Sequence, residues 1–307
     1  MSRIASWGQM IVRDWKKYWQ RYLLVLPLIA FYLIWCYGPM YGIQIGFRDF
    51  SPRKGITGSA WVGLKHFKTF FDGAYAFRII RNTFLINFYN LIFGFPLPII
   101  FALMLTEIRR RNFKRMVQTI TYMPYFISIV IICGLIRDFG ASDGVFGYIA
   151  RLFGQTPVNI LGDQKYFRTV YVTSEIWQFL GWNSILFMST LTGINPELFE
   201  AATIDGASRI KQIWHVSLPG ILPTIAILLV LRVGNMMSLG FEKVILLYNP
   251  VVYETADVIS SFVFRKGIID ADFGFATAVG LFNSLVNFAL VIIANKVSAV
   301  LTETSLW

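Results

Sequence analysis

Six long apolar stretches, separated by polar segments, dominate the pattern along this chain. Each holds about 20 residues or more, enough for a helix rising 1.5 Å per residue to cross the roughly 30 Å hydrocarbon core of a bilayer. The pattern therefore predicts an all-α membrane protein, a polytopic bundle of about six transmembrane helices with both termini on one side. The predicted spans are residues 22–47, 83–106, 116–136, 169–192, 221–247 and 276–296.

Composition supports a membrane protein and argues against other classes. Of 307 residues, 56% are hydrophobic and 15% are charged, which is more apolar surface than a soluble core buries. The formal net charge of +11 does not indicate a nucleic-acid partner, because basic residues gather beside apolar stretches, as at 13–21 and 109–115. Cys36 and Cys133 lie within apolar stretches and form neither a disulfide framework nor a metal-ligand pattern.

A polar segment at 193–220, between the fourth and fifth predicted spans, has the signals of two short helices. Asn195 can accept hydrogen bonds from the first free amides of a helix that we expect at 196–205. Gly206 suits the left-handed residue that ends such a helix. A second helix follows, and Pro219 is expected to stop it before the fifth span.

The same segment carries a motif. It reads Glu200-Ala-Ala-Thr-Ile-Asp-Gly-Ala-Ser, and Leu218-Pro219 follows. This order resembles the Glu-Ala-Ala (EAA) loop of permease subunits in binding-protein-dependent ABC importers. The resemblance implies a cytoplasmic helix-turn-helix coupling loop, whose contact and turn positions for a cytosolic ATPase are Glu200, Ala201, Ala202, Asp205 and Gly206.

Further motifs extend this resemblance over nearly the whole chain, to permeases of the LplB type in the carbohydrate-uptake group. Each motif alone is weak evidence, whereas their order is strong. The motifs are Gly38-Pro-Met-Tyr-Gly-Ile, Gly58-Ser-Ala-Trp-Val-Gly-Leu-Lys-His-Phe, Asn82-Thr-Phe, Pro124-Tyr-Phe-Ile-Ser, Phe241-Glu-Lys-Val-Ile-Leu-Leu-Tyr-Asn-Pro and Ala256-Asp-Val-Ile-Ser.

The resemblance implies an assembly in the bacterial cytoplasmic membrane. Its other members would be a second related permease, forming a heterodimer, two cytosolic ABC ATPase subunits and an extracytoplasmic solute-binding lipoprotein. The substrate would be an oligosaccharide or polysaccharide fragment. ATP and Mg would belong to the ATPase, since this chain lacks a phosphate-binding Gly-x-x-x-x-Gly-Lys-Ser/Thr loop and has no recognisable catalytic constellation. We therefore expect a non-catalytic, multi-pass subunit without a cofactor of its own.

Domain organisation follows from the spans and the loop. Counting basic residues does not decide the orientation, but the short segment 107–115 favours a cytoplasmic side, and the coupling-loop resemblance implies that both termini share it. We expect a basic cytoplasmic tail at 1–21, a type-1 permease domain at 22–297 and a cytoplasmic tail at 298–307. The outward segments would be ordinary surface loops or a platform for the binding protein; they are 48–82, 137–168 and 248–275.

Polar residues within spans are costly and usually face a bundle interior or a water-filled cavity. Carboxylate and carboxamide groups bind sugar hydroxyls, and a tryptophan ring stacks on a sugar. Candidate pathway residues on the fourth span are Glu175, Gln178, Trp182 and Asn183, and a comparable stripe on the fifth span holds Arg232, Asn235, Met236 and Leu239.

Several alternatives stay open at this point. Arg232 could meet an acidic sugar, pair with Glu175 or serve the structure alone. Glu242 and Lys243 read as a snorkelling pair at the outer end of a span, or as part of an outer gate. An ion-coupled secondary transporter would use Glu175 and Arg232 as coupling charges, although no inverted repeat is evident. A third class is a non-transporting membrane scaffold.

Overall fold

The computed structural model describes residues 2–302, which are almost entirely helical, as predicted. The longer helices are α1 (Ser2–Phe31), α4 (Ala76–Tyr89), α5 (Pro96–Glu107), α6 (Arg111–Tyr122), α7 (Ile129–Gly140), α9 (Gln164–Thr192), α12 (Leu218–Gly234) and α16 (Phe273–Thr302). The shorter helices are α2 (Gly55–Gly58), α3 (Lys65–Asp72), α8 (Val145–Leu152), α10 (Pro196–Ile204), α11 (Arg209–Gln212), α13 (Phe241–Leu247), α14 (Tyr253–Ala256) and α15 (Ile259–Phe264).

Irregular helical turns and one small sheet complete these elements. Strands β1 (Arg48–Asp49) and β2 (Ala60–Trp61) pair antiparallel. The π-helical turns are Tyr32–Tyr37, Asn90–Gly94, Ile213–Ser217 and Arg265–Ile269. The 3₁₀ turns are Gly38–Phe47, Met123–Phe126, Ile160–Gly162 and Pro250–Val252.

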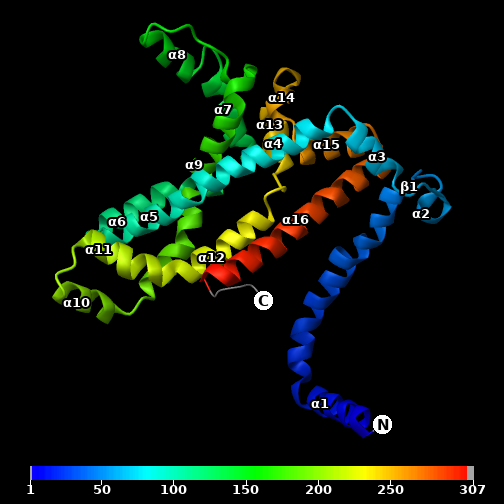
Figure 1. Ribbon diagram of the computed structural model, residues 1–307, viewed down its shortest axis with the longest axis horizontal. Helices are drawn as coiled ribbons and strands as arrows, with labels where there is room; N and C mark the ends of the chain where they lie inside the picture. The colour runs from blue at the N-terminus through cyan, green and yellow to red at the C-terminus, as the bar shows by residue number, and fades with distance from the viewer. Residues whose placement is uncertain (1, 303–307) are drawn as a thin grey trace.

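The helices form an elongated bundle with distinct ends (Figure 1). Helix α9 packs against α5 and α12, and α12 packs in turn against α16. Helices α10 and α11 lie at one end, whereas α3, α14 and the small sheet lie towards the other. Helix α1 stands apart from the bundle, and the apolar window of the span Lys17–Phe47 is 0% buried within the chain. This apolar face therefore requires lipid or another chain to cover it.

Four helical segments are long and apolar enough to cross a membrane: Lys17–Phe47, Ala76–Glu107, Arg209–Gly234 and Phe273–Val300. They correspond to the first, second, fifth and sixth predicted spans. The fourth prediction falls on α9, which has 29 residues and so is about 43 Å long. Its polar residues keep it outside that group, so the total of six spans stays a prediction.

The third predicted span, 116–136, is wrong as a single straight helix. Two helical segments, 111–126 and 129–152, meet there at 97°. Pro124 lies in the 3₁₀ turn that ends the first segment, and Ser128 precedes the second with an extended backbone. The break follows from the missing amide of proline, which cannot continue the helical hydrogen-bond ladder.

The predicted bounds of the fifth span, 221–247, are also wrong. The helix ends at Gly234, an irregular segment follows, and α13 is a separate helix. Beyond the helix end, the amide of Met237 donates to a side chain of α16 instead of a carbonyl one turn back: Asn287 Oδ1 accepts this hydrogen bond at 2.9 Å. Gly234 itself packs against Val291 of α16, which leaves no room for a side chain.

The start of this span differs from expectation too, because Pro219 does not stop the preceding helix. The helix runs from Arg209 through Pro219 to Gly234. The π-helical turn Ile213–Ser217 accommodates the proline, since the amide of Leu218 bonds to the carbonyl of Ile213, five residues back. The second helix of the loop and the span thus form one continuous helical segment.

Close helix packing places α9 against α6. A Cβ on Gly181 would fall against the backbone carbonyl of Thr121 and within 2.6 Å of the Tyr122 ring. We expect Gly181→Ala to lower the free energy of unfolding by about 1–3 kcal/mol through overpacking. The control is Gly134→Ala on α7, where a Cβ meets nothing within 4 Å. Thermal unfolding in lipid nanodiscs measures both, and equal melting temperatures would contradict the packing described here.

Candidate functional site

The polar loop at one end of the bundle folds into two helices joined by a turn. Asn195 Oδ1 accepts from the amide of Glu197 at 3.1 Å, which caps the start of α10. Gly206 has φ 75°, a left-handed conformation that confirms the predicted turn and favours glycine. Gln212 is buried, and its amide donates to Thr203 Oγ1 at 2.9 Å across the turn. The two helices are thus held at a fixed angle.

The outer surface of this loop is unusually apolar. Glu200, Ala201, Asp205 and Gly206 are exposed, whereas Ala202 is half-buried. Large apolar side chains beside them are also exposed, among them Ile204 (86%), Ile210 (69%) and Trp214 (63%). Rigid helices that display small, apolar and charged side chains together are suited to a groove on another protein.

Three adjoining cavities follow one face of α9 within the bundle. The first, about 380 Å³, lies between α5, α9 and α12 near Leu186. The second, about 270 Å³, lies between Asn90 and Trp182. The third, about 460 Å³, reaches α13. Arg232 lines all three, so the cavities form a row along α9 with this guanidinium in common.

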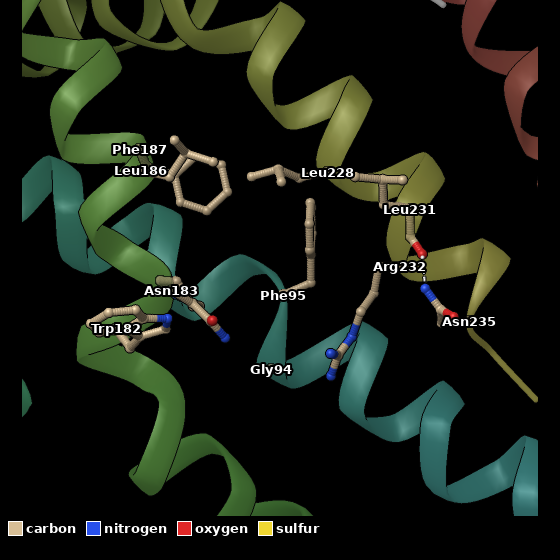
Figure 2. Close-up of a pocket in the computed structure, with 11 residues that line it drawn as sticks. Gly94, Phe95, Trp182, Asn183, Leu186, Phe187, Leu228, Leu231, Arg232 and Asn235 are labelled. Carbon is tan, nitrogen blue, oxygen red and sulfur yellow. Dashed lines mark hydrogen bonds between the residues drawn. The ribbon is translucent and has the colours of Figure 1, made fainter. Parts of the chain in front are cut away.

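Figure 2 shows the first cavity. Asn183 from α9 and Arg232 from α12 extend into it from opposite sides, with the ring of Phe95, the residue before α5, between them. Asn235 lies beyond Arg232, and its amide donates to the carbonyl of Leu231 at 3.0 Å. The cavity therefore combines one cation and two carboxamides with an apolar wall.

Glu175 is paired, but with a partner that differs from the one considered from the sequence. Lys243 Nζ lies 2.7 Å from Glu175 Oε2, and the Lys243 side chain is only 4% exposed. The same ammonium lies 4.8 Å from the centroid of the Tyr171 ring. The snorkelling interpretation of Lys243 is wrong, because the ammonium points into the bundle, where Glu175 compensates its charge.

The remaining α9 candidates line the cavities with different surroundings. Trp182 stacks on Tyr125 with ring centroids 4.0 Å apart and an interplanar angle of 1°, so one face of the indole is covered. Gln178 lines the third cavity and is 5% exposed. Its Oε1 atom is buried and accepts no hydrogen bond from any described residue. An occupant with hydroxyl groups would satisfy this acceptor.

The predicted stripe on the fifth span is wrong beyond Arg232. Asn235, Met236 and Leu239 follow the end of the helix, so they share no helical face with Arg232. Met236 is buried and lines none of the three cavities, and Leu239 lines the third cavity from the apolar core. The sequence pattern missed Asn90, which lines two cavities from a π-helical turn, although polarity within the second span could have marked it.

A separate polar network fixes the opposite end of the bundle. Asp257 is fully buried, and Arg265 Nη2 lies 2.7 Å from its Oδ2. Burial lowers the pKa of Arg265, but the hydrogen bond and negative charge of Asp257 more than offset this effect. The pKa of Arg265 is therefore raised overall. Asn82 donates to the Asp257 carbonyl at 3.0 Å and accepts from Arg168 at 2.8 Å. The network ties α4, α9 and the segment before α16 together.

Comparison with known proteins identifies the family. Residues 94–299 match the family described as binding-protein-dependent transport system inner membrane components. The chain belongs to this family. It is therefore a membrane subunit of a transport system rather than an enzyme, and membership argues against both the ion-coupled transporter and the scaffold.

Individual relatives cover nearly the whole chain. The polygalacturonan/rhamnogalacturonan transport system permease protein YteP of Bacillus subtilis is 39% identical over 93% of this chain and 89% of its own. Protein LplB of the same organism is 39% identical over 95% of this chain and 91% of its own. This chain is also similar to a chain in the crystal structure of a bacterial alginate ABC transporter in complex with an alginate pentasaccharide-bound periplasmic protein. The two are 41% identical, with a TM-score of 0.88, and the match covers 96% of this chain and 99% of that one.

Proposed function

We propose that this chain is the permease subunit of an ATP-driven, binding-protein-dependent importer for an oligosaccharide or polysaccharide fragment. The observation that carries the proposal is the similarity to the alginate transporter chain, at TM-score 0.88 and over 96% of this chain. The row of cavities along α9 supports it, because carboxamides and aromatic rings suit a hydroxylated ligand. A second, related permease forms the other half of the pathway.

The loop around α10 and α11 couples this subunit to the ATPase. Two cytosolic ATPase subunits bind ATP and Mg, and one of them receives the loop at Glu200, Ala201, Ala202, Asp205 and Gly206. Its exposed apolar side chains and fixed turn support this role, as does the continuous helix into α12. The loop, and with it both termini, then lies in the cytoplasm, and the chain itself needs no cofactor.

The opposite end of the bundle receives the solute-binding lipoprotein. The Asp257 network supports this assignment, because its buried ion pair and hydrogen bonds tie separate segments of the chain together and so hold this end in one shape. Alternating access then proceeds as the ATPase dimer closes, moves α10 and α11, and reorients α12 around the cavities.

Assembly and stimulation test this function together. The chain is co-expressed with a second permease and a candidate ATPase, purified in lipid nanodiscs, and mixed with binding proteins loaded with neutral or acidic oligosaccharides. We expect the three components to co-purify and ATP hydrolysis to rise with one loaded binding protein. An ATPase that never associates, or whose rate no loaded binding protein changes, would contradict the proposal.

A further inference from the structure

We infer that this subunit recognises saccharides bearing a carboxylate, and that Arg232 binds this group in the first cavity. The inference rests on the proposed importer function and names its substrate class. Among the described residues that line this cavity, Arg232 alone carries a charge. A carboxylate entering the cavity therefore meets a cation without an opposing acid.

Arg232 is free to bind such a group. Its side chain is exposed and forms no ion pair or hydrogen bond with another side chain in the described part of the chain, 2–302. A guanidinium presents a planar fork of donors that matches a carboxylate in bidentate geometry. The apolar walls of the cavity strengthen the attraction between this guanidinium and an anion relative to an open protein surface.

The neighbouring acids leave this positive charge in place. Glu175, which lines the second and third cavities, is neutralised by Lys243 at 2.7 Å. Glu242 lines the third cavity only and is exposed at the start of α13. The first cavity therefore carries the charge of Arg232 alone. In the second cavity the charge of Glu175 is compensated by Lys243, whose ammonium lies beside it at the third cavity.

The other lining groups suit the sugar rings that carry the carboxylate. Asn183 extends into the first cavity beside Arg232 (Figure 2), and its carboxamide can both donate to and accept from hydroxyl groups. The buried Oε1 of Gln178, unpartnered among the described residues, supplies a further acceptor along the same row. Neutral groups thus bind the hydroxyls, and Arg232 provides the preference for an acid.

The test compares a charged saccharide with its neutral counterpart. The complete complex is reconstituted in vesicles with its binding protein, and ATP-driven uptake is measured for trigalacturonate and for its methyl ester. Uptake is normalised to the measured occupancy of the binding protein by each saccharide. The variants are Arg232→Gln, which removes the charge, and Arg232→Lys, which keeps it. Arg137→Gln is the control, since Arg137 is an exposed arginine on α7 that lines none of the three cavities.

We expect the wild type and Arg137→Gln to prefer the acid. Arg232→Gln should reduce acid uptake about tenfold or more, as expected for losing a charge-assisted hydrogen bond, and retain ester uptake, whereas Arg232→Lys should retain the preference. Equal reduction of both saccharides by Arg232→Gln, no reduction of either, or a wild-type preference for the ester would overturn the inference while leaving the importer intact. No ATP-driven uptake of either saccharide by the wild type would also overturn the inference. The importer function falls with it only if, in addition, no loaded binding protein raises the rate of ATP hydrolysis.

Discussion

ATP-driven uptake is expected to fall about 30-fold or more when Gly206 is replaced by valine. Gly206 has φ 75°, where a β-branched residue is strongly disfavoured, so the turn between α10 and α11 must change. Side chains at both ends of this turn then lose their alignment with the ATPase groove. Losing the central contact of a protein interface typically costs about 2 kcal/mol or more, which corresponds to about 30-fold in affinity.

The measurement is ATPase retention on the purified permease, followed by uptake in vesicles. A Cβ at Gly206 meets nothing within 4 Å, so the cost of the change comes from the backbone of the turn and not from packing in the bundle. The bundle should therefore still fold, which thermal unfolding of the purified permease checks. Gly193→Val is the control, since Gly193 ends α9 beside the same loop with φ −86°. Ile204→Asp changes the exposed apolar surface without touching the turn, and should also weaken ATPase binding. Undiminished coupled uptake in both Gly206→Val and Ile204→Asp would refute the coupling role of the loop.

The free energy of unfolding is expected to fall by about 3–5 kcal/mol in Lys243→Met. Lys243 is 4% exposed and pairs with Glu175 at 2.7 Å, so its removal leaves a carboxylate within the bundle without its cation. Breaking a buried pair from one side costs far more than the pair itself contributes. For the same reason, the double variant Glu175→Gln/Lys243→Met should recover most of the lost stability.

Thermal unfolding of the subunit in nanodiscs measures this effect, with a control that differs mainly in burial. Lys266 and Asp270 also lie 2.7 Å apart, but their side chains are 37% and 43% exposed. Lys266→Met should therefore change stability by about 0.5 kcal/mol or less. If Lys243→Met and Lys266→Met shift the melting temperature equally, or if the double variant is no more stable than Lys243→Met, the buried pair is not as described.

Local sequence signals predicted part of this architecture well. Length and hydropathy located the first, second, fifth and sixth spans, although the end of the fifth is wrong. Asparagine, proline and glycine at 195, 196 and 206 predicted the cap, start and turn of α10. Such signals act over a few residues, so no tertiary information is needed. The motif around Glu200 then indicated the family without any structure.

Features set by distant partners could not be predicted in the same way. The end of α12 at Gly234 depends on Asn287, which comes from α16 and accepts from the chain after the helix. The partner of Glu175 is Lys243 on α13 and not Arg232, and this pairing depends on how α13 packs against α9 in the folded chain. Pro124 signalled a disturbance, but its sequence context does not distinguish a mild kink from the 97° bend observed there.

The most direct test of the importer function is the energy source for uptake. Vesicles containing the complete complex are supplied with saccharide-loaded binding protein outside, with or without ATP and Mg inside, and with ionophores that collapse ion gradients. The account predicts saccharide accumulation that requires internal ATP and survives the ionophores. Accumulation that continues without ATP and disappears when an ion gradient is collapsed would contradict it and identify a secondary transporter.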